Sequence, residues 1–261
     1  MNFEKKSRYD FYDLVEIMKI LRSPDGCPWD KVQTHESIRQ NFIEETYEAI
    51  EAIDTKDVAL MREELGDVMM QVIFHAIMEE EVGTFDISDV VDEVSKKLIV
   101  RHPHVFADVI ADTPEQVLTN WDKIKMDTKE QKTQSQVLDS VSKSLPALMY
   151  SQKIQHKAAK VGFDFEKTDD ALAKVSEELS ELKSAISNND AENMSEELGD
   201  LLFSVVNVAR FIKVDSEKAL YDATVKFTDR FSKVEQLCNE RSIDMTEAPL
   251  SVLDSLWDEV K

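Results

Sequence analysis

Glycine and proline are scarce in this sequence, which has five of one and six of the other among 261 residues. So few chain-breaking residues argue against a fold rich in turns and favour long helices. Cysteine is scarcer still, because Cys27 and Cys238 are the only two and lie far apart in the sequence. That usage excludes a disulfide framework and is typical of a reducing compartment, so we expect a cytoplasmic protein.

Long apolar runs are also missing. The first residues, MNFEKKSRYD, hold no apolar segment of the kind found in signal peptides. No later run approaches the length of a membrane span. We therefore expect neither secretion nor a membrane partner.

Positive charge is in short supply. Lysine and arginine together number 31 against 53 aspartates and glutamates, which gives a net charge of −22. Such a chain has no broad basic face, so we expect no nucleic-acid partner. A small anionic ligand would need a metal ion or a local basic pocket to be held. The hydrophobic content of 42% is nevertheless enough to bury a core.

An internal repeat organises the residues that are present. The pentapeptide EELGD occurs at 63–67 and again at 196–200, and an acidic run precedes each copy: NFIEETYEAIEAI in the first half and KVSEELSELKSAI in the second. The offset is constant, because 177 − 44, 197 − 64 and 200 − 67 all equal 133. The sequence therefore contains a duplication.

The duplication extends to basic and aromatic residues further along each half. SKKLIVRHPHV resembles VKFTDRFSKV, and VLTNWDKIK resembles VLDSLWDEVK. The matching residues are Lys97 with Lys226, Arg101 with Arg230, and Trp121 with Trp257.

Hydrophobic periodicity is helical throughout. Residues 11–21, for example, place apolar side chains at spacings of three and four, and no long stretch alternates with period two. We predict an all-α fold of two tandem helical-bundle domains, residues 1–125 and 146–261. The residues between them, 126–145, begin with the polar MDTKEQKTQSQ and are predicted to be a linker.

The acidic residues of each repeat fall on defined helix faces. At 100° per residue, Glu45 lies inside the apolar stripe of its helix, Glu48 on its flank and Glu44 further round. On the next helix Glu64 and Asp67 are one turn apart at the edge of the apolar stripe. The second copy repeats the pattern with Glu178, Glu181, Glu177, Glu197 and Asp200.

If the two acidic helices of each half pack as neighbours, their carboxylates converge on one half-buried spot. Like charges held close together repel, so protons or a cation must neutralise them. Oxygen ligands without sulfur or imidazole suit Mg²⁺, with Mn²⁺ as the alternative. A di-iron centre is disfavoured, because it typically uses Glu-x-x-His and none of the five histidines has a glutamate three residues before it. The competing interpretation is an ordinary solvated acidic face.

Two glycines stand inside these helices, directly before the aspartates of the motif: Gly66 and Gly199. A glycine in the middle of a helix costs about 1 kcal/mol relative to alanine. We therefore expect another helix or a ligand to approach the backbone closely at these positions.

The order of these motifs resembles a known family. EExxE followed by ExxD, together with GCPWDKVQTHESI, RHPHVFAD, SLPALMYSQKIQ and VGFDF, is similar to the two-domain MazG family of all-α nucleoside triphosphate pyrophosphohydrolases. The resemblance covers nearly the whole chain. It implies Mg²⁺-dependent hydrolysis of a nucleoside triphosphate to the monophosphate and pyrophosphate by a homodimer.

The resemblance also implies residue roles. Metal ligands are expected at Glu178, Glu181, Glu197 and Asp200, and at their counterparts Glu45, Glu48, Glu64 and Asp67. Substrate contacts are expected at Lys174, Glu178, Glu196, Asp200, Lys226, Arg230 and Trp257, and in the first half at Lys97, Arg101 and Trp121. The first half departs from the pattern at position 41, where the counterpart of Lys174 is Asn41.

Water is the expected nucleophile, because no Ser-His or Cys-His arrangement is present in the sequence. Glu177 or Glu44 is then the candidate base or a group that orients it, and the sequence does not decide between these roles. We expect broad nucleotide specificity, in keeping with removal of unwanted nucleotides from the pool. The alternative is a non-catalytic acidic module that binds a protein or a nucleotide without turnover.

Overall fold

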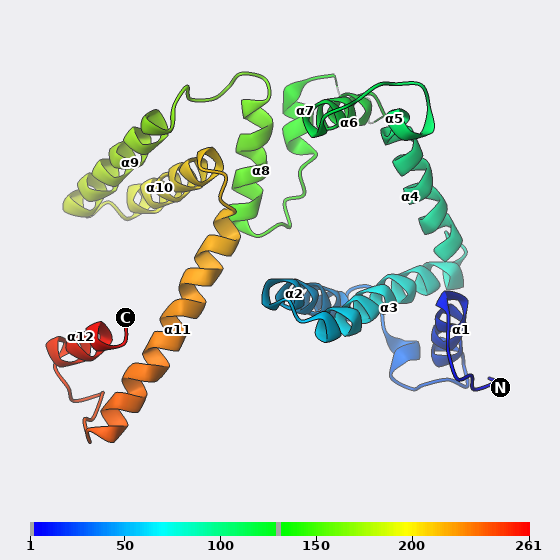
Figure 1. Ribbon diagram of the computed structural model, residues 1–261, viewed down its shortest axis with the longest axis horizontal. Coiled ribbons are helices and arrows are strands. Elements are labelled where there is room, and N and C mark those ends of the chain that lie inside the picture. The colour runs from blue at the N-terminus through cyan, green and yellow to red at the C-terminus, as the bar shows by residue number, and fades with distance from the viewer. Residues whose placement is uncertain (1–2, 129–131) are drawn as a thin grey trace. The chain divides into compact units, whose positions relative to one another are not determined.

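Every regular element in the described part of the chain is helical, which confirms the predicted all-α fold (Figure 1). The computed structural model describes residues 3–128 and 132–261. The chain divides into two compact units, Met1–Lys125 and Met126–Lys261. The segment predicted as a linker, 126–145, contains the end of helix α6 and the short helix α7 (Gln134–Asp139), while its residues 129–131 lie outside the described residues.

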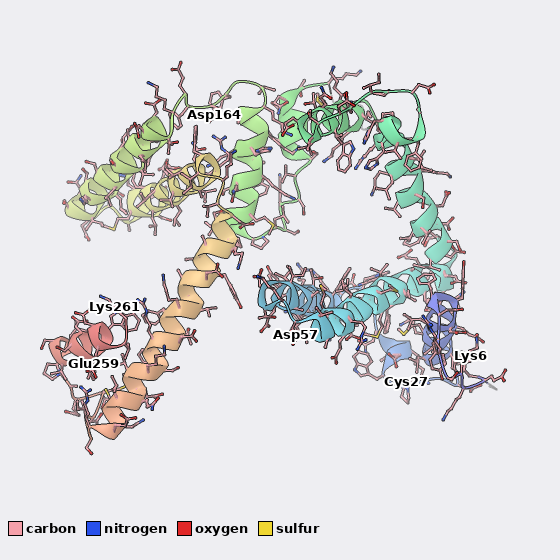
Figure 2. All side chains as sticks on the ribbon, viewed as in Figure 1. Lys6, Cys27, Asp57, Asp164, Glu259 and Lys261 are labelled. Atoms are coloured by element: carbon pink, nitrogen blue, oxygen red, sulfur yellow. The ribbon has the colours of Figure 1, made fainter. Side chains whose placement is uncertain are left out.

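The first unit is built around a helical hairpin, α2 (Arg39–Thr55) and α3 (Val58–Val82). Its remaining helices are α1 (Phe11–Arg22), the 3₁₀ turn η1 (Asp30–Val32), α4 (Ile87–Arg101), α5 (Pro103–Phe106) and α6 (Pro114–Thr128). The hairpin turn is short because Lys56 takes the left-handed conformation (φ 57°) and ends α2. Asp57, labelled in Figure 2, then caps α3 by accepting hydrogen bonds from the backbone N–H groups of Ala59 and Leu60.

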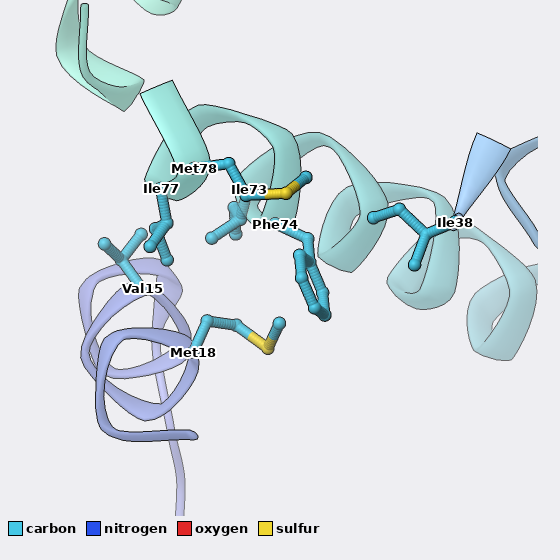
Figure 3. Close-up of a cluster of buried hydrophobic side chains, with 7 residues drawn as sticks. All are labelled: Val15, Met18, Ile38, Ile73, Phe74, Ile77 and Met78. Atoms are coloured by element: carbon cyan, nitrogen blue, oxygen red, sulfur yellow. The ribbon is translucent and has the colours of Figure 1, made fainter. Parts of the chain in front are cut away.

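Helix α1 packs against the second half of α3 and forms the main core of the first unit. Val15 and Met18 of α1 meet Ile73, Phe74 and Ile77 of α3 in a buried cluster (Figure 3). The cluster is completed by Ile38 and Met78. This core fixes the C-terminal half of α3 and leaves its N-terminal half, which carries EELGD, paired with α2.

A buried arginine ties the loop after α1 to this core. The Arg22 guanidinium bonds the Glu81 carboxylate through two nitrogens, at 2.8 and 2.7 Å, and donates to the backbone oxygen of Asp30 at 2.7 Å. It also lies over the Phe74 ring, 5.2 Å from the centroid. The loop that leads into α2 is thereby held against α3.

The second unit repeats the hairpin with α9 (Thr168–Asn188) and α10 (Ala191–Phe211). Its turn is built in the same way, because Asn189 is left-handed (φ 53°) and Asp190 caps α10. These two residues stand 133 positions after Lys56 and Asp57, since 189 − 56 and 190 − 57 both equal 133. The other helices are α7, α8 (Ala147–Ala159), α11 (Ser216–Glu240) and α12 (Leu250–Glu259).

Helix α11 leaves the α9–α10 hairpin and ends in a small core of its own (Figure 1). Val234 and Cys238 of α11 pack on Leu256 of α12 there. The Arg210 guanidinium, near the end of α10, binds the Asp164 carboxylate, which is labelled in Figure 2, and so ties the VGFDF segment to the hairpin.

Both hairpins leave apolar side chains uncovered in the single chain. In the second unit these are Leu172, Leu179 and Ile186 on α9, with Leu198 and Leu202 on α10, all between 40% and 57% exposed. In the first unit Ile43, Tyr47, Ile50, Leu65 and Met69 are comparably open. Over the described residues, no helix combines the length and apolarity needed to cross a membrane.

Candidate metal and nucleotide site

Each hairpin brings three motif carboxylates to one spot. In the first unit Glu45 and Glu48 of α2 and Glu64 of α3 each place an oxygen within 4.8 Å of the others. Glu45, predicted inside the apolar stripe of its helix, is half-buried, and Glu64, predicted at the edge of the next stripe, is buried. The short turn at Lys56 and Asp57 sets the two helices in register and so aligns these residues.

The second unit forms the same kind of cluster from a slightly different set. Glu178 of α9 and Glu197 and Asp200 of α10 place oxygens within 4.8 Å of one another. Glu178 is buried at 5% exposure, whereas Asp200 is exposed. The duplicated sequence motif is therefore also a duplicated arrangement of side chains.

The fourth predicted ligand of each set stands beside its cluster. Asp67 is close enough to raise the pKa values of Glu45 and Glu64 through like-charge repulsion. Glu181 shares a hydrogen bond with Glu178. All eight predicted ligand residues are thus gathered at the two hairpins, while their role in binding metal stays a prediction.

The first cluster carries an unbalanced negative charge. Burial is the main cause that raises the pKa of Glu45 above its ordinary value, followed by the charges of Asp67 and Glu48. Burial and the charges of Glu48, Asp67 and Glu45 raise the pKa of Glu64 in the same way. Such groups favour protons or a cation, and the three converging oxygens fit a hard divalent ion such as Mg²⁺ or Mn²⁺.

The second cluster contains its own counter-charge. Lys174 places its Nζ 2.5 Å from Glu178 Oε1 and 3.0 Å from Glu177 Oε1. This hydrogen bond lowers the pKa of Glu178 and raises that of Lys174. Burial, with the charges of Glu178 and Asp200, raises the pKa of Glu197. The first unit has no matching cation, since Asn41 holds that position.

The two candidate bases lie outside the clusters, on the exposed side of their helices. Glu177 accepts from Lys174. Glu44 accepts a long hydrogen bond, 3.4 Å, from Gln40 Nε2. Glu196, expected to contact substrate, is exposed beside Glu197. Their catalytic and binding roles stay predictions.

The basic and aromatic residues expected at the substrate form a separate group in the second unit. Lys226 and Arg230 lie on α11, and the Arg230 guanidinium lies 5.9 Å from the centroid of the Trp257 ring, which also packs on Phe227. Helix α11 packs chiefly on α8, α10 and α12. No ion pair within the described chain joins Lys226 or Arg230 to a motif carboxylate.

The counterparts in the first unit are likewise held by other elements. Lys97 is exposed on α4, and Arg101 stands in its last turn. Trp121 of α6 packs edge-on against His102, 4.7 Å between centroids, and its buried Nε1 has no hydrogen-bond partner among the described residues. His102 ends α4, and its Nδ1 lies 2.6 Å from the Leu98 oxygen, in agreement with a structural role at a helix terminus.

The expectation for the two motif glycines is wrong in one respect. A Cβ added at Gly66 or Gly199 would meet no atom of the described chain within 4 Å beyond its own helix turn and sequence neighbours. No other helix of the same chain therefore crosses closely at these positions. Close approach of a ligand stays a prediction.

The raised pKa of Glu64 generates a stability prediction for the metal-free protein. Since folding raises this pKa, the favourable contribution of the protonated group is complete below its unfolded-state value, about 4.3. That contribution is lost as the pH rises through the folded-state value, and the ionised group then destabilises the fold. We expect Glu64→Gln to raise the melting temperature in EDTA at pH 7.5, with the difference disappearing toward pH 4.

Differential scanning fluorimetry at both pH values measures this effect, and Glu63→Gln, an exposed neighbour on the same helix, is the matched control. Added Mg²⁺ should raise the melting temperature of the parent more than that of Glu64→Gln. Equal behaviour of the two variants would identify Glu64 as an ordinary surface charge.

Comparisons with known proteins agree with this arrangement. The model of the MazG nucleotide pyrophosphohydrolase domain matches residues 33–106 and 166–235. The starts of the two segments differ by the repeat offset, 166 − 33 = 133, and the segments contain the two hairpins.

Full-length relatives match as well. The nucleoside triphosphate pyrophosphohydrolase/pyrophosphatase MazG of Thermotoga maritima is 46% identical over 96% of this chain and 95% of its own. The nucleoside triphosphate pyrophosphohydrolase of Escherichia coli is 43% identical over 95% of each chain. The uncharacterized protein YabN of Bacillus subtilis is 47% identical over 99% of this chain but 53% of its own length. The chain belongs to the MazG nucleotide pyrophosphohydrolase family.

Proposed function

We propose that this protein is a Mg²⁺-dependent nucleoside triphosphate pyrophosphohydrolase that converts a triphosphate and water to the monophosphate and pyrophosphate. The observation that carries the proposal is the pair of carboxylate clusters, built by two hairpins at a constant offset. Similarity over almost the whole chain to proteins named for this activity supports it. We further propose that several nucleotides are accepted, as a role in clearing the nucleotide pool would require.

The motif carboxylates would hold the cation in each unit. Mg²⁺, when bound, supplies positive charge that balances the phosphate oxygens and helps to activate water. Glu45 and Glu64 suit this task because burial and the neighbouring carboxylates raise their pKa values, and the exposed Glu48 completes the cluster. Glu178, Glu197 and Asp200 would do the same in the second unit.

Lys174 has a second task in this proposal. In the chain alone its ammonium is paired with Glu178 and Glu177. If Glu178 held the cation, Lys174 would give up that partner and its ammonium would be available to a phosphate oxygen near the cluster. Glu177, which accepts a hydrogen bond from Lys174, is the proposed base or the group that orients it.

A non-catalytic acidic module remains the alternative. Such a protein would need neither two complete carboxylate sets nor a lysine paired with a buried carboxylate at one of them. The measurement that separates the two is metal-dependent release of pyrophosphate, present with Mg²⁺ and absent with EDTA for the enzyme.

We propose that two copies of the chain associate and complete the site. The uncovered apolar rows on α9 and α10 support this, because exposed apolar surface of that kind is typical of an interface. The separation of Lys226, Arg230 and Trp257 from the carboxylates of their own chain supports it too. A second copy would cover the rows and bring additional cations to the phosphates. We place the enzyme in the cytoplasm, where its free cysteines stay reduced.

The proposed dimer is tested by charge at the apolar row. Leu202→Glu puts a carboxylate on a side chain that is 51% exposed on α10, and burying that charge would be costly. One chain has a mass of 29.9 kDa. We expect light scattering to show twice this mass for the parent and a shift toward the mass of a single chain for the variant. Leu250→Glu, at 72% exposure on α12, is the control and should leave the mass unchanged.

The position of attack decides the class of reaction. Water that attacks the α-phosphorus gives the monophosphate and pyrophosphate, whereas attack at the γ-phosphorus gives the diphosphate and phosphate. We expect hydrolysis in ¹⁸O-labelled water to place the label in the monophosphate, because the water oxygen stays on the phosphorus that it attacks. A nucleoside diphosphate detected by chromatography as the first product would contradict attack at the α-phosphorus.

We expect the second unit to carry most of the turnover. It has the fuller basic set, because Lys174 stands at its cluster and the first unit has Asn41 instead. In a chain of net charge −22, local cations should decide which half holds a triphosphate better. The pair Glu197→Gln with Asp200→Asn should abolish most activity, and Glu64→Gln with Asp67→Asn should leave most of it. The reverse result would show that the number of local basic residues does not determine which unit has the higher activity.

A further inference from the structure

The first unit contains a pocket directly beside its carboxylate cluster. The pocket has a volume of about 380 Å³, within the range of about 300–1,000 Å³ typical of small-molecule sites. Its walls come from the segment before α2, from α2 and α3, and from the start of α4, and are lined by His35, Arg39, Phe42, Val72, His75, Ala76, Phe85 and Val90. Apart from Arg39 the lining is apolar or aromatic, which suits a flat ring.

The pocket and the carboxylates share one groove between α2 and α3. Phe42 precedes Glu45 by three residues, and Val72 follows Asp67 by five. At a rise of 1.5 Å per residue, the pocket begins about 5–8 Å along the groove from the carboxylates. A ligand that places its phosphates at the carboxylates would therefore reach the pocket with a group that is separated from the phosphates by about the length of one sugar ring.

A chain of hydrogen bonds fixes the histidines of the pocket. His35 Nε2 lies 2.8 Å from Glu79 Oε1, and His35 Nδ1 lies 2.7 Å from His75 Nδ1. The Glu79 carboxylate can only accept, so when both imidazoles are in the neutral form His35 donates from Nε2 and accepts at Nδ1. His75 must then donate from Nδ1, which leaves its Nε2 as an acceptor. That nitrogen has no partner within the described chain.

A second unused acceptor lies one turn before His75 on the same helix. Gln71 is buried at 5% exposure and uses its side-chain amide to hydrogen-bond Glu45. Its Oε1 is buried without a partner in the described chain. Buried acceptors are normally satisfied, so a ligand with N–H or O–H donors would supply what the groove lacks.

We propose that this pocket holds the base of a nucleotide whose phosphates lie at the first carboxylate cluster, with His75 Nε2 accepting from an exocyclic amino group of the base. The inference rests on the proposed function of that cluster. It assigns the first unit a preference for amino-bearing bases. The second unit has no counterpart of the histidine pair, because Thr168 and Val208 stand 133 residues after His35 and His75. Val214 stands at the position of Phe85, at the offset of 129 that also relates Lys226 to Lys97.

The test uses the full chain with Glu197→Gln and Asp200→Asn, so that the first unit is the intended binding site. Calorimetry in Mg²⁺ compares inorganic tripolyphosphate with the α,β-methylene analogues of cytidine and uridine triphosphate, whose bases differ at position 4 by amino against oxo. We expect the cytidine analogue to bind about tenfold or more tightly than either of the others.

Two variants and one control locate the base. Val90→Trp fills the pocket from its rim and should reduce both nucleotides to the affinity of tripolyphosphate, whose own binding stays unchanged. Val91→Trp, on the adjacent and 48% exposed side chain, should change nothing. His75→Phe keeps a ring but removes the acceptor, so the two nucleotides should then bind equally.

The outcomes separate the inference from the function beneath it. Binding of tripolyphosphate with no preference for the cytidine analogue would overturn the inference alone, and so would a Val90→Trp variant that binds nucleotides as the parent does. Failure of all three ligands to bind would overturn the proposed function of the first cluster, and the inference with it.

Discussion

The repulsion between carboxylates held at the two helical hairpins is the constraint on which the rest of the structure depends. Burial of Glu64 and Glu178 places ionisable oxygens at the edge of an apolar stripe, where leucine would pack at no electrostatic cost. The two units respond differently. The second unit balances Glu178 with Lys174, whereas the first leaves Glu45 and Glu64 with raised pKa values.

The two duplicated halves therefore share a backbone arrangement but differ in the balance of charge at their carboxylate clusters. A built-in cation offsets part of the charge of the second cluster, and in the proposed function the same lysine contacts a phosphate oxygen. The first cluster lacks that lysine but stands beside an aromatic pocket and a stacked pair of histidines.

The hairpins and their carboxylates were predictable from sequence because both depend on local rules. Helical periodicity determines the helix face on which Glu45 lies. The short turn between the two helices then requires them to pack side by side, which brings Glu64 near Glu45. The meeting of His35 with His75 was not predictable in this way. It depends on how an irregular segment, held by Arg22 and the core at Phe74, runs back against α3. Nor does the order of motifs along the chain reveal that Arg230 and Trp257 group together, apart from the acidic cluster that precedes them.

The left-handed residues at the hairpin turns, Lys56 and Asn189, have a consequence for folding and for ancestry. They close each acidic hairpin over a short stretch of chain, so little loop entropy is lost when its helices meet. Contacts of such low sequence separation form early, before distant elements arrive. Each hairpin is thus a self-contained module that carries its whole carboxylate cluster in one continuous segment. A single duplication of that segment copies the complete cluster at once, and the copy is then free to diverge in the residues around it.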